Sequence, residues 1–558
     1  MAYSTSSRTG SQDYFGDSDG VSTKASSVTM PKYNKPDERT HLLSDSPREG
    51  FLHNLPTTPP RWLTQQRLVY LLMLIVVVVG AGDQIIESPQ TRIFESIICY
   101  RYYEEADPSK LLAGRGSVGP GAIGGVLESD CKVNVVQEQL AMLRGYQQLL
   151  DGFPSLLLAL PFGWAADKFG RKPFLALGLV SFALRYAWIQ LVCWWWQSFD
   201  IRMTWLSTLH GIMSGGSGVV SGMFFVVLSD ITSEADRASV FLRVGGSSLL
   251  SNLLLPPISA WLMRINPWIP NLIGLLIYVV SLFSLPFVPE TLNYRRSPAA
   301  DSSLPPTPSV ETAPARPSTP KASEPSPPHP LARLRGQAAS AISFLSQDWR
   351  VAVLIVPFIA HMLLGMSSQL LIQYMSKRYG ISFSDATLLL TVYNGVRVAL
   401  LFVILPYLST HLLRTLGWSV PVKDLYLTRL SMFFMLAGFV LIAMSPSAWT
   451  VAISLAIASL GSGAYLVLRS FIASLVPAHH IARLFSTITL IDTLGSMFGS
   501  ALLAGLFKRG LVLGGGWIGL PFYFIGLISA AFAAMLFTVR LRPGESGDKL
   551  ADDAPDEL

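Results

Sequence analysis

Residues 163–172 read Gly-Trp-Ala-Ala-Asp-Lys-Phe-Gly-Arg-Lys, a polar stretch between two long apolar runs. Each run, residues 143–165 and residues 174–196, is long enough for a helix that crosses a bilayer, which takes about 20 residues. Gly163 permits close approach of helices, and Gly170 permits a tight turn. The stretch therefore indicates a short basic loop that joins two membrane-spanning helices.

The composition of the whole chain agrees with this interpretation. The 558 residues are 50% hydrophobic and only 14% charged, whereas soluble domains carry about 25% charged residues. The 42 basic and 36 acidic side chains give a net charge of +6, and the bases cluster between the apolar runs. Membrane topology explains such clusters better than nucleic-acid binding does. We therefore expect a polytopic protein in the lipid bilayer that binds no nucleic acid.

About twelve apolar runs are long enough to span a membrane. Backbone polar groups in lipid must be satisfied within their own segment, so we expect these runs to be helices. The predicted spans are residues 67–87, 143–165, 174–196, 203–228, 240–263, 268–288, 351–374, 386–410, 430–444, 449–475, 484–507 and 517–539. The predicted fold class is an all-α membrane protein with about 12 transmembrane helices in two six-helix halves.

Polar segments divide the chain into five parts. Residues 1–60 and residues 290–348 are rich in Ser, Thr and Pro and poor in large apolar groups, which is typical of disorder. The predicted parts are an N-terminal tail (1–60), an N-terminal six-helix half (61–289), a Pro/Ser-rich linker (290–348), a C-terminal six-helix half (349–541) and a C-terminal tail (542–558).

Two short sequences recur in both halves with the same offset. Leu-Pro-Phe at 160–162 corresponds to Leu-Pro-Tyr at 405–407, and Gly-Ser-Gly at 216–218 recurs at 461–463, in both cases 245 residues later. A shared offset favours duplication over coincidence. Parallel repeats of this kind place a substrate site near the middle of the membrane, between the halves.

With these features in place, residues 163–172 resemble the signature loop of the major facilitator superfamily, which joins the second and third helices. The matching positions are Gly163, Asp167, Lys168, Gly170, Arg171 and Lys172. The resemblance implies the major facilitator fold, transport by alternating access, and a cytoplasmic loop. It also implies that the loop steadies the outward-open state by contacting the eleventh helix, where Asp492 is the candidate contact.

A cytoplasmic signature loop places both termini and the linker in the cytoplasm. Residues 88–139 then form a long outer loop on the oxidising side, which holds Cys99 and Cys131. These cysteines form either a disulfide, which we favour, or two free thiols. Residues 82–103 resemble a fungal branch of facilitators that is similar to the proton-coupled folate transporter group, without carrying the folate substrate across.

Ionisable side chains at lipid depth are costly, so each is a functional candidate. Asp83 and Glu87 lie one helical turn apart, which suits proton carriage, and His210 could titrate near physiological pH, although a packing role is the commoner one. The candidates for proton coupling or substrate binding are Asp83, Glu87, Asp151, Arg185, His210, Asn394 and Arg397.

The sequence favours secondary active transport of a small solute that uses the proton gradient, with symport favoured slightly over antiport. There is no P-loop for nucleotide-driven pumping and no convincing nucleophile–base arrangement, so we expect no enzyme, no cofactor and no metal. The alternatives are a nutrient sensor that signals through its linker, an uncoupled facilitator, and drug or metabolite efflux by proton antiport.

The expected partners are a small-molecule substrate, protons and the bilayer, and we expect a monomer. Residues 38–43, Glu-Arg-Thr-His-Leu-Leu, have the spacing of an acidic dileucine sorting signal, which would favour vacuolar or endosomal membranes; the alternative is a chance match in a polar tail. The family resemblance favours the plasma membrane. The sequence therefore predicts either the plasma membrane or the vacuolar membrane.

Overall fold

A computed structural model describes residues 65–113, 126–232, 234–291, 349–476 and 481–539. Contacts divide the chain into Met1–Leu55 and Pro56–Leu558. All described residues belong to the second unit, and the account that follows concerns this unit alone. The predicted tails and nearly all of the predicted linker lie outside the described residues.

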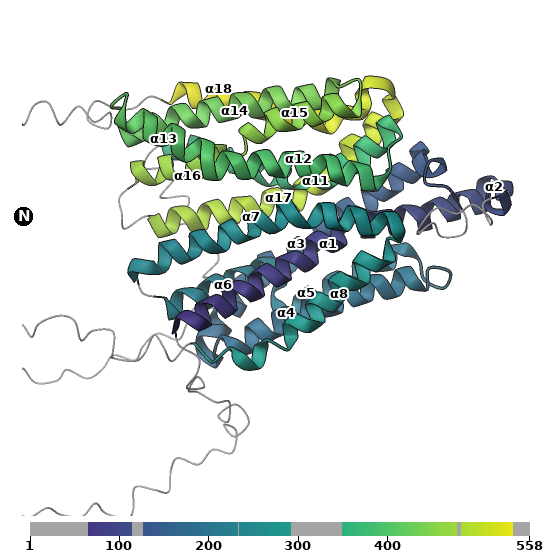
Figure 1. Cartoon of the computed structure of the whole chain (residues 1–558), viewed down its shortest axis with the longest axis horizontal. Coiled ribbons are helices and arrows are strands. Elements are labelled where there is room, and N and C mark those ends of the chain that lie inside the picture. The colour runs from purple at the N-terminus through teal and green to yellow at the C-terminus, as the bar shows by residue number, and fades with distance from the viewer. Residues whose placement is uncertain (1–64, 114–125, 233, 292–348, 477–480, 540–558) are drawn as a thin grey trace, which may run out of the picture. The chain divides into compact units, whose positions relative to one another are not determined.

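The described residues before the linker, called the N-terminal half below, are helical nearly throughout (Figure 1). Its elements are α1 (Gln65–Ala106), α2 (Pro108–Ala113), η3 (Asp130–Lys132), α3 (Asn134–Phe169), α4 (Lys172–Trp194), η4 (Ile201–Thr208), α5 (Leu209–Ser214), α6 (Gly216–Ile231), α7 (Glu234–Ile265), α8 (Trp268–Leu282) and η5 (Leu285–Phe287).

The described residues after the linker form the C-terminal half, which is built in the same way. Its elements are α10 (Trp349–Ile355), α11 (Phe358–Tyr379), α12 (Phe383–Ala399), the π-helical turn η7 (Leu400–Ile404), α13 (Leu405–Arg414), α14 (Val420–Met444), α15 (Ala448–Leu460), α16 (Ala464–Leu475), α17 (Ile481–Leu513), η9 (Gly515–Gly519) and α18 (Leu520–Thr538). The two halves meet where α3 packs on α17 and where α7 packs on α12.

Every predicted span falls mostly on helix, which confirms the all-α membrane architecture. Among the described residues, nine helices are long and apolar enough to cross a membrane, and a tenth is counted if the bent α3 is one span. The bend of 52° in α3 falls between Asn134–Ala159 and Pro161–Phe169. Proline removes a backbone donor and clashes with the preceding turn, which accounts for a bend at this place.

The long outer loop expected at 88–139 is largely wrong, because α1 continues to Ala106 and α3 already begins at Asn134. With 42 residues, α1 is about 63 Å long, well beyond the thickness of a bilayer. The extension persists because Ile93, Phe94 and Ile97 bury an apolar stripe in the core, where they are at most 1% exposed. The sequence contains this signal, because Ile93, Phe94 and Ile97 are spaced as on one face of a helix.

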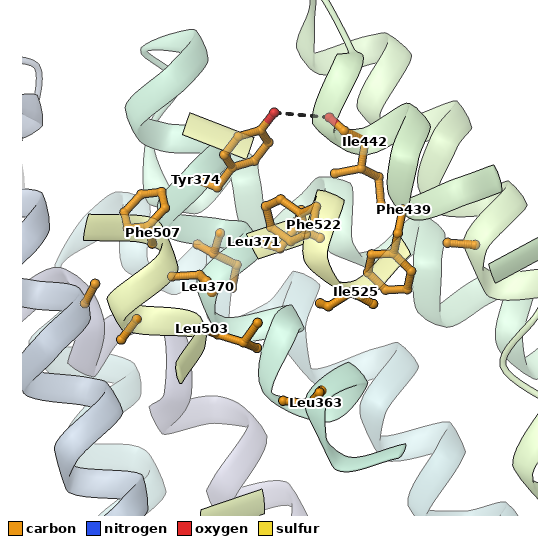
Figure 2. Packing of buried hydrophobic residues seen from close by; sticks show 14 of the residues in the cluster. Leu363, Leu370, Leu371, Tyr374, Phe439, Ile442, Leu503, Phe507, Phe522 and Ile525 are labelled. Atoms are coloured by element: carbon orange, nitrogen blue, oxygen red, sulfur yellow. Dashed lines mark hydrogen bonds between the residues drawn. The ribbon is translucent and has the colours of Figure 1, made fainter. Parts of the chain in front are cut away.

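The core of the C-terminal half consists of interlocking aromatic and aliphatic side chains (Figure 2). Phe439 and Phe522 stack with ring centroids 6.5 Å apart, and Tyr374 meets Phe522 edge-on at 4.8 Å. The hydroxyl of Tyr374 donates a hydrogen bond of 3.1 Å to the carbonyl of Ile442. These contacts join α11, α14 and α18 into one packed body.

The repeated Gly-Ser-Gly sequences fall at helix breaks in both halves. Gly215 and Gly216 have φ of 75° and 83°, and they lie between the end of α5 and the first residue of α6, while residues 461–463 separate α15 from α16. Positive φ strains residues with a Cβ, so glycine suits the first break. At the second break, a Cβ on Gly461 would lie 2.6 Å from the carbonyl of Ser431. Interrupted helices at corresponding positions of two repeats are a feature of transporter folds.

Candidate functional site

The most exposed of the carboxylates at bilayer depth belongs to Asp83 in α1. Its Oδ1 accepts hydrogen bonds from the hydroxyl of Tyr186 in α4, at 2.6 Å, and from that of Tyr278 in α8. The two rings stack with centroids 4.9 Å apart, and Tyr278 is fully buried. No donor among the described residues reaches Oδ2. One oxygen of Asp83 is thus fixed by the protein, and the other is available.

Glycines bring α1 and α8 close enough for this arrangement. A Cβ on Gly82 would lie 3.0 Å from the Tyr278 ring, and a Cβ on Gly274 would lie 3.1 Å from the carbonyl of Gly82 and collide with Ile86. The backbones can approach because neither residue has a side chain. The tyrosine ring therefore packs flat beside the turn that carries Asp83.

A buried ion pair lies beside the tyrosines. Arg185 of α4 binds Asp151 of α3 through Nη2 and Oδ2, and their side chains are only 22% and 12% exposed. The Arg185 guanidinium also lies 5.5 Å from the centre of the Tyr186 ring. Burial of such a pair usually costs more free energy than the attraction returns, so the pair suggests a functional requirement.

Arg144 extends this polar region toward Glu87. The guanidinium of Arg144 donates a hydrogen bond of 2.8 Å to the carbonyl of Glu87 and another to the Thr91 hydroxyl. The Glu87 carboxylate faces Arg144 and Gln369 of α11. Sequence reasoning missed Arg144, which is the second residue of the predicted span 143–165.

An apolar cavity of about 250 Å³ lies next to Asp83, between α1, α4, α6 and α7. Its wall is mainly aliphatic and aromatic, and it also includes three serines, Ser217, Ser221 and Ser248. Asp83 is the one charged residue in this wall. A pocket that is mostly apolar with a few polar groups is typical of small-molecule sites.

The C-terminal half carries a different cluster, which joins three helices. Asp492 of α17 accepts a 2.5 Å hydrogen bond from Arg469 of α16 and lies 3.1 Å from Nδ1 of His361 of α11. The His361 ring packs on Tyr465 with centroids 4.5 Å apart. Sequence reasoning overlooked His361, although it is an ionisable residue inside a predicted span. The predicted contact of Asp492 with the signature loop is not made here and stays a prediction for another conformation.

The signature loop itself binds within the N-terminal half. Arg171 pairs with Asp230 of α6 and with Asp167, and its backbone N–H donates a 2.8 Å hydrogen bond to Glu290. Gly170 has φ of 101°, and a Cβ there would lie 2.5 Å from the Glu290 carboxylate, so this turn requires glycine. The side chain of Asp167 is 69% exposed.

Three other residues of the signature loop are Gly163, Lys168 and Lys172. A Cβ on Gly163 would meet nothing within 4 Å, so the close helix approach expected there is absent in this conformation. Lys168 lies over the rings of Trp164 and Phe169, at 5.1 and 5.3 Å from their centres. Lys172 donates its backbone N–H to Glu290 at 3.1 Å.

Three other predicted site residues, His210, Asn394 and Arg397, have no hydrogen bond or ion pair with Asp83 among the described residues. The Nδ1 atom of His210 is buried without a hydrogen-bond partner among the described residues, and its carbonyl accepts from Ser181. Asn394 donates to the carbonyl of Asn252 in α7 at 2.8 Å. Arg397, just before the π-helical turn, has a buried Nε without a partner in the described part of the chain.

At the opposite end from the signature loop, a disulfide joins Cys99 and Cys131, whose Cα atoms are 5.3 Å apart. Next to it, the buried carboxylate of Glu95 accepts hydrogen bonds from Lys132 at 2.8 Å and from Gln137 at 2.5 Å. Glu128 accepts the backbone N–H of Phe383 in the other half, at 2.8 Å. We call this region, around Cys131, the disulfide end.

Electrostatics at the disulfide end favour the ionised form of Glu128. Burial opposes its ionisation, but Lys132 and Arg92 outweigh this effect, and the pKa of Glu128 is lowered. Further bonds cross between the halves here: Gln373 donates to the carbonyl of Gln137 at 2.6 Å. The disulfide end therefore holds the two halves together.

Comparison with known proteins identifies the class. The model of the Major Facilitator Superfamily matches residues 145–500, and the chain belongs to this superfamily. It is 30% identical over 514 residues to the MFS efflux pump atnC of Emericella nidulans, covering 90% of this chain and 95% of the relative. It is 28% identical over 486 residues to the efflux pump ustT of Aspergillus flavus, covering 86% and 88%.

Solved structures agree on the fold. A crystal structure of a D-xylose–proton symporter superposes with a TM-score of 0.53 at 12% identity, covering 86% of this chain and 99% of that one. The predicted superfamily, its fold and a multi-pass membrane transporter are confirmed. The finer resemblance to the folate transporter group stays a prediction.

Proposed function

We propose that this transporter exports a small molecule in exchange for protons, and that Asp83 is the residue at which the two compete. Transport follows from the family. The direction is inferred from relatives that are named efflux pumps. Antiport therefore replaces the symport that the sequence alone had favoured.

The observation that carries the proposal is the arrangement around Asp83. Three carboxylates, Asp83, Glu87 and Asp151, face two guanidinium groups, Arg144 and Arg185. With all five ionised, the region carries one excess negative charge at lipid depth. Such a charge is costly there, so binding one proton or one cation would neutralise it. Asp83 is the exposed member, with Oδ2 available.

Alternating access fixes the order of events. We infer that the signature loop and both termini face the cytoplasm, as basic loops usually do. The disulfide end is then outside, and its bonds between the halves close the outer side in this conformation. In the inward-facing state, Asp83 releases its proton and substrate enters the cavity. The halves then move to the outward-facing state, in which a proton from outside binds Asp83 and displaces the substrate.

The proposal is tested with inverted membrane vesicles that contain the full-length protein, acidified inside and incubated with a mixture of small fungal metabolites. Mass spectrometry then shows which compounds accumulate. At least one compound should accumulate, and its accumulation should vanish with a protonophore or in Asp83→Asn. Glu105→Gln is the matched control, because it removes an exposed acid from the same helix.

Two outcomes would contradict the proposal in different ways. Entry of a compound only up to its outside concentration, unchanged by the protonophore and by Asp83→Asn, would indicate an uncoupled facilitator. Accumulation only in right-side-out vesicles with acid outside would indicate uptake by symport. The location, in the plasma membrane or the vacuolar membrane, and the monomeric state stay predictions beside this proposal.

A further inference from the structure

We propose that the cavity beside Asp83 binds lipophilic organic cations, which are then the substrate class of this transporter. This inference rests on the proposed function, because it assigns to the substrate the same carboxylate that exchanges protons. It is carried by the chemistry of the cavity wall and by the unoccupied oxygen of Asp83.

The charge of the cavity favours a cation. Asp83 is the one charged residue among the fourteen that line it, and no basic side chain is part of the wall. The guanidinium of Arg185, which interacts electrostatically with Asp83, is bound by Asp151. An ionised carboxylate in such surroundings needs a positive partner, whereas an organic anion would meet a like charge without compensation.

The hydrogen bonds of Asp83 leave one direction open. Tyr186 and Tyr278 both donate to Oδ1, and no described donor reaches Oδ2. The other charged groups near Asp83 are Glu87 on its own helix and Arg185 on α4. A ligand cation at Oδ2 would therefore complete the coordination of the carboxylate without breaking either tyrosine bond.

The rest of the wall suits an apolar ligand body. Nine of the fourteen lining residues are aliphatic or aromatic, including the rings of Phe182, Phe224 and Phe225. Aromatic faces attract cations as well as apolar surface, and this attraction strengthens where water is excluded. A compact charge within a large apolar body matches both features of the cavity.

The test uses two probes of nearly equal size and shape but opposite charge, tetraphenylphosphonium and tetraphenylborate. Equilibrium dialysis measures the binding of each to the purified full chain in detergent at pH 8. The phosphonium should bind saturably, one per chain, and the borate should not.

Two variants locate the site. Asp83→Asn should weaken phosphonium binding at least tenfold, whereas Glu105→Gln should leave it unchanged. Gly80→Leu should also weaken it while keeping Asp83, because Gly80 lines the cavity and a Cβ there meets nothing within 4 Å. Normal thermal unfolding of each variant shows that the loss is not a folding defect.

Equal binding of both probes, absence of saturable phosphonium binding, or full binding by Asp83→Asn would each overturn the proposal. These failures are separable from failure of the proposed function. Proton-driven accumulation of an anionic compound in inverted vesicles would keep the antiport and reject the cationic class. Phosphonium binding at Asp83 without proton-driven transport of any compound would keep the cation site and reject the antiport.

Discussion

The two halves share their helix plan but differ in the charges they place at lipid depth. The N-terminal cluster has three carboxylates and two guanidinium groups, whereas the C-terminal cluster has one carboxylate, Asp492, between two basic side chains, His361 and Arg469. Both retain the Gly-Ser-Gly break. The corresponding breaks agree with the duplication that the repeated sequences predict, whereas the two polar clusters differ, one being rich in acids and the other in bases.

The largest expected effect separates the two clusters by function. Asp83→Asn should reduce proton-driven accumulation in inverted vesicles to that of vesicles without the protein, because the exchangeable carboxylate is gone. Asp492→Asn should lower accumulation without abolishing it, since Asp492 already has two basic partners. Equal loss in both variants would show that coupling depends on both halves.

A second prediction compares what the ion pairs Arg185–Asp151 and Arg469–Asp492 contribute to the free energy of unfolding. Arg185→Leu leaves Asp151 without its direct ionic partner and should destabilise the protein by about 3–5 kcal/mol. Arg469→Leu should cost less, because His361 still contacts Asp492. Unfolding in detergent with increasing denaturant measures both.

The double variant Arg185→Leu/Asp151→Leu is the control for this prediction. It removes both charges and should recover most of the lost stability, yet it should not restore normal proton-driven transport. A double variant as unstable as Arg185→Leu would mean that the guanidinium acts by packing rather than by charge.

A third prediction concerns the disulfide end and has a defined pH dependence. Because the pKa of Glu128 is lowered in the folded protein, its stabilising contribution is fully present above the ordinary glutamate value of 4.5 and is lost as the pH falls through the lowered value. Glu128→Gln should therefore cost about 1 kcal/mol at pH 7 and progressively less toward pH 3. Thermal unfolding from pH 7 to pH 3 measures the difference, which should not be constant.

The smallest effect is expected from His361→Gln. The variant keeps the Arg469–Asp492 bond and removes only the contact of His361 with Asp492, so folding should be normal. Proton-driven accumulation in inverted vesicles should therefore stay close to that of the unaltered protein, because Asp492 keeps Arg469 as its partner. His210→Gln is a matched control. A larger effect of this variant would indicate that a histidine of the N-terminal half contributes to transport.

Sequence reasoning succeeded where a physical rule acts locally. Apolar length placed the spans, and the signature loop gave the superfamily. Ionisable residues at lipid depth selected Asp83, Asp151 and Arg185, which the structure brings into one region.

It failed where partners come from distant helices. Nothing in the sequence around Tyr278 shows that its hydroxyl binds Asp83, because the bond joins residues 195 positions apart. The predicted span ends at residue 87 because polar residues follow, whereas α1 continues to Ala106 because Ile93 and Ile97 extend its apolar stripe. The rotation of each helix, which decides what faces the cavity, depends on packing across the whole bundle.

The sulfur chemistry of the chain has a practical consequence. Of its three cysteines, Cys99 and Cys131 are joined and Cys193 is buried, so the protein presents no accessible thiol. A single cysteine introduced near either end of the bundle would be the sole target of a maleimide dye. Single-cysteine variants of this chain can therefore report, one side at a time, which of its two faces is open to water.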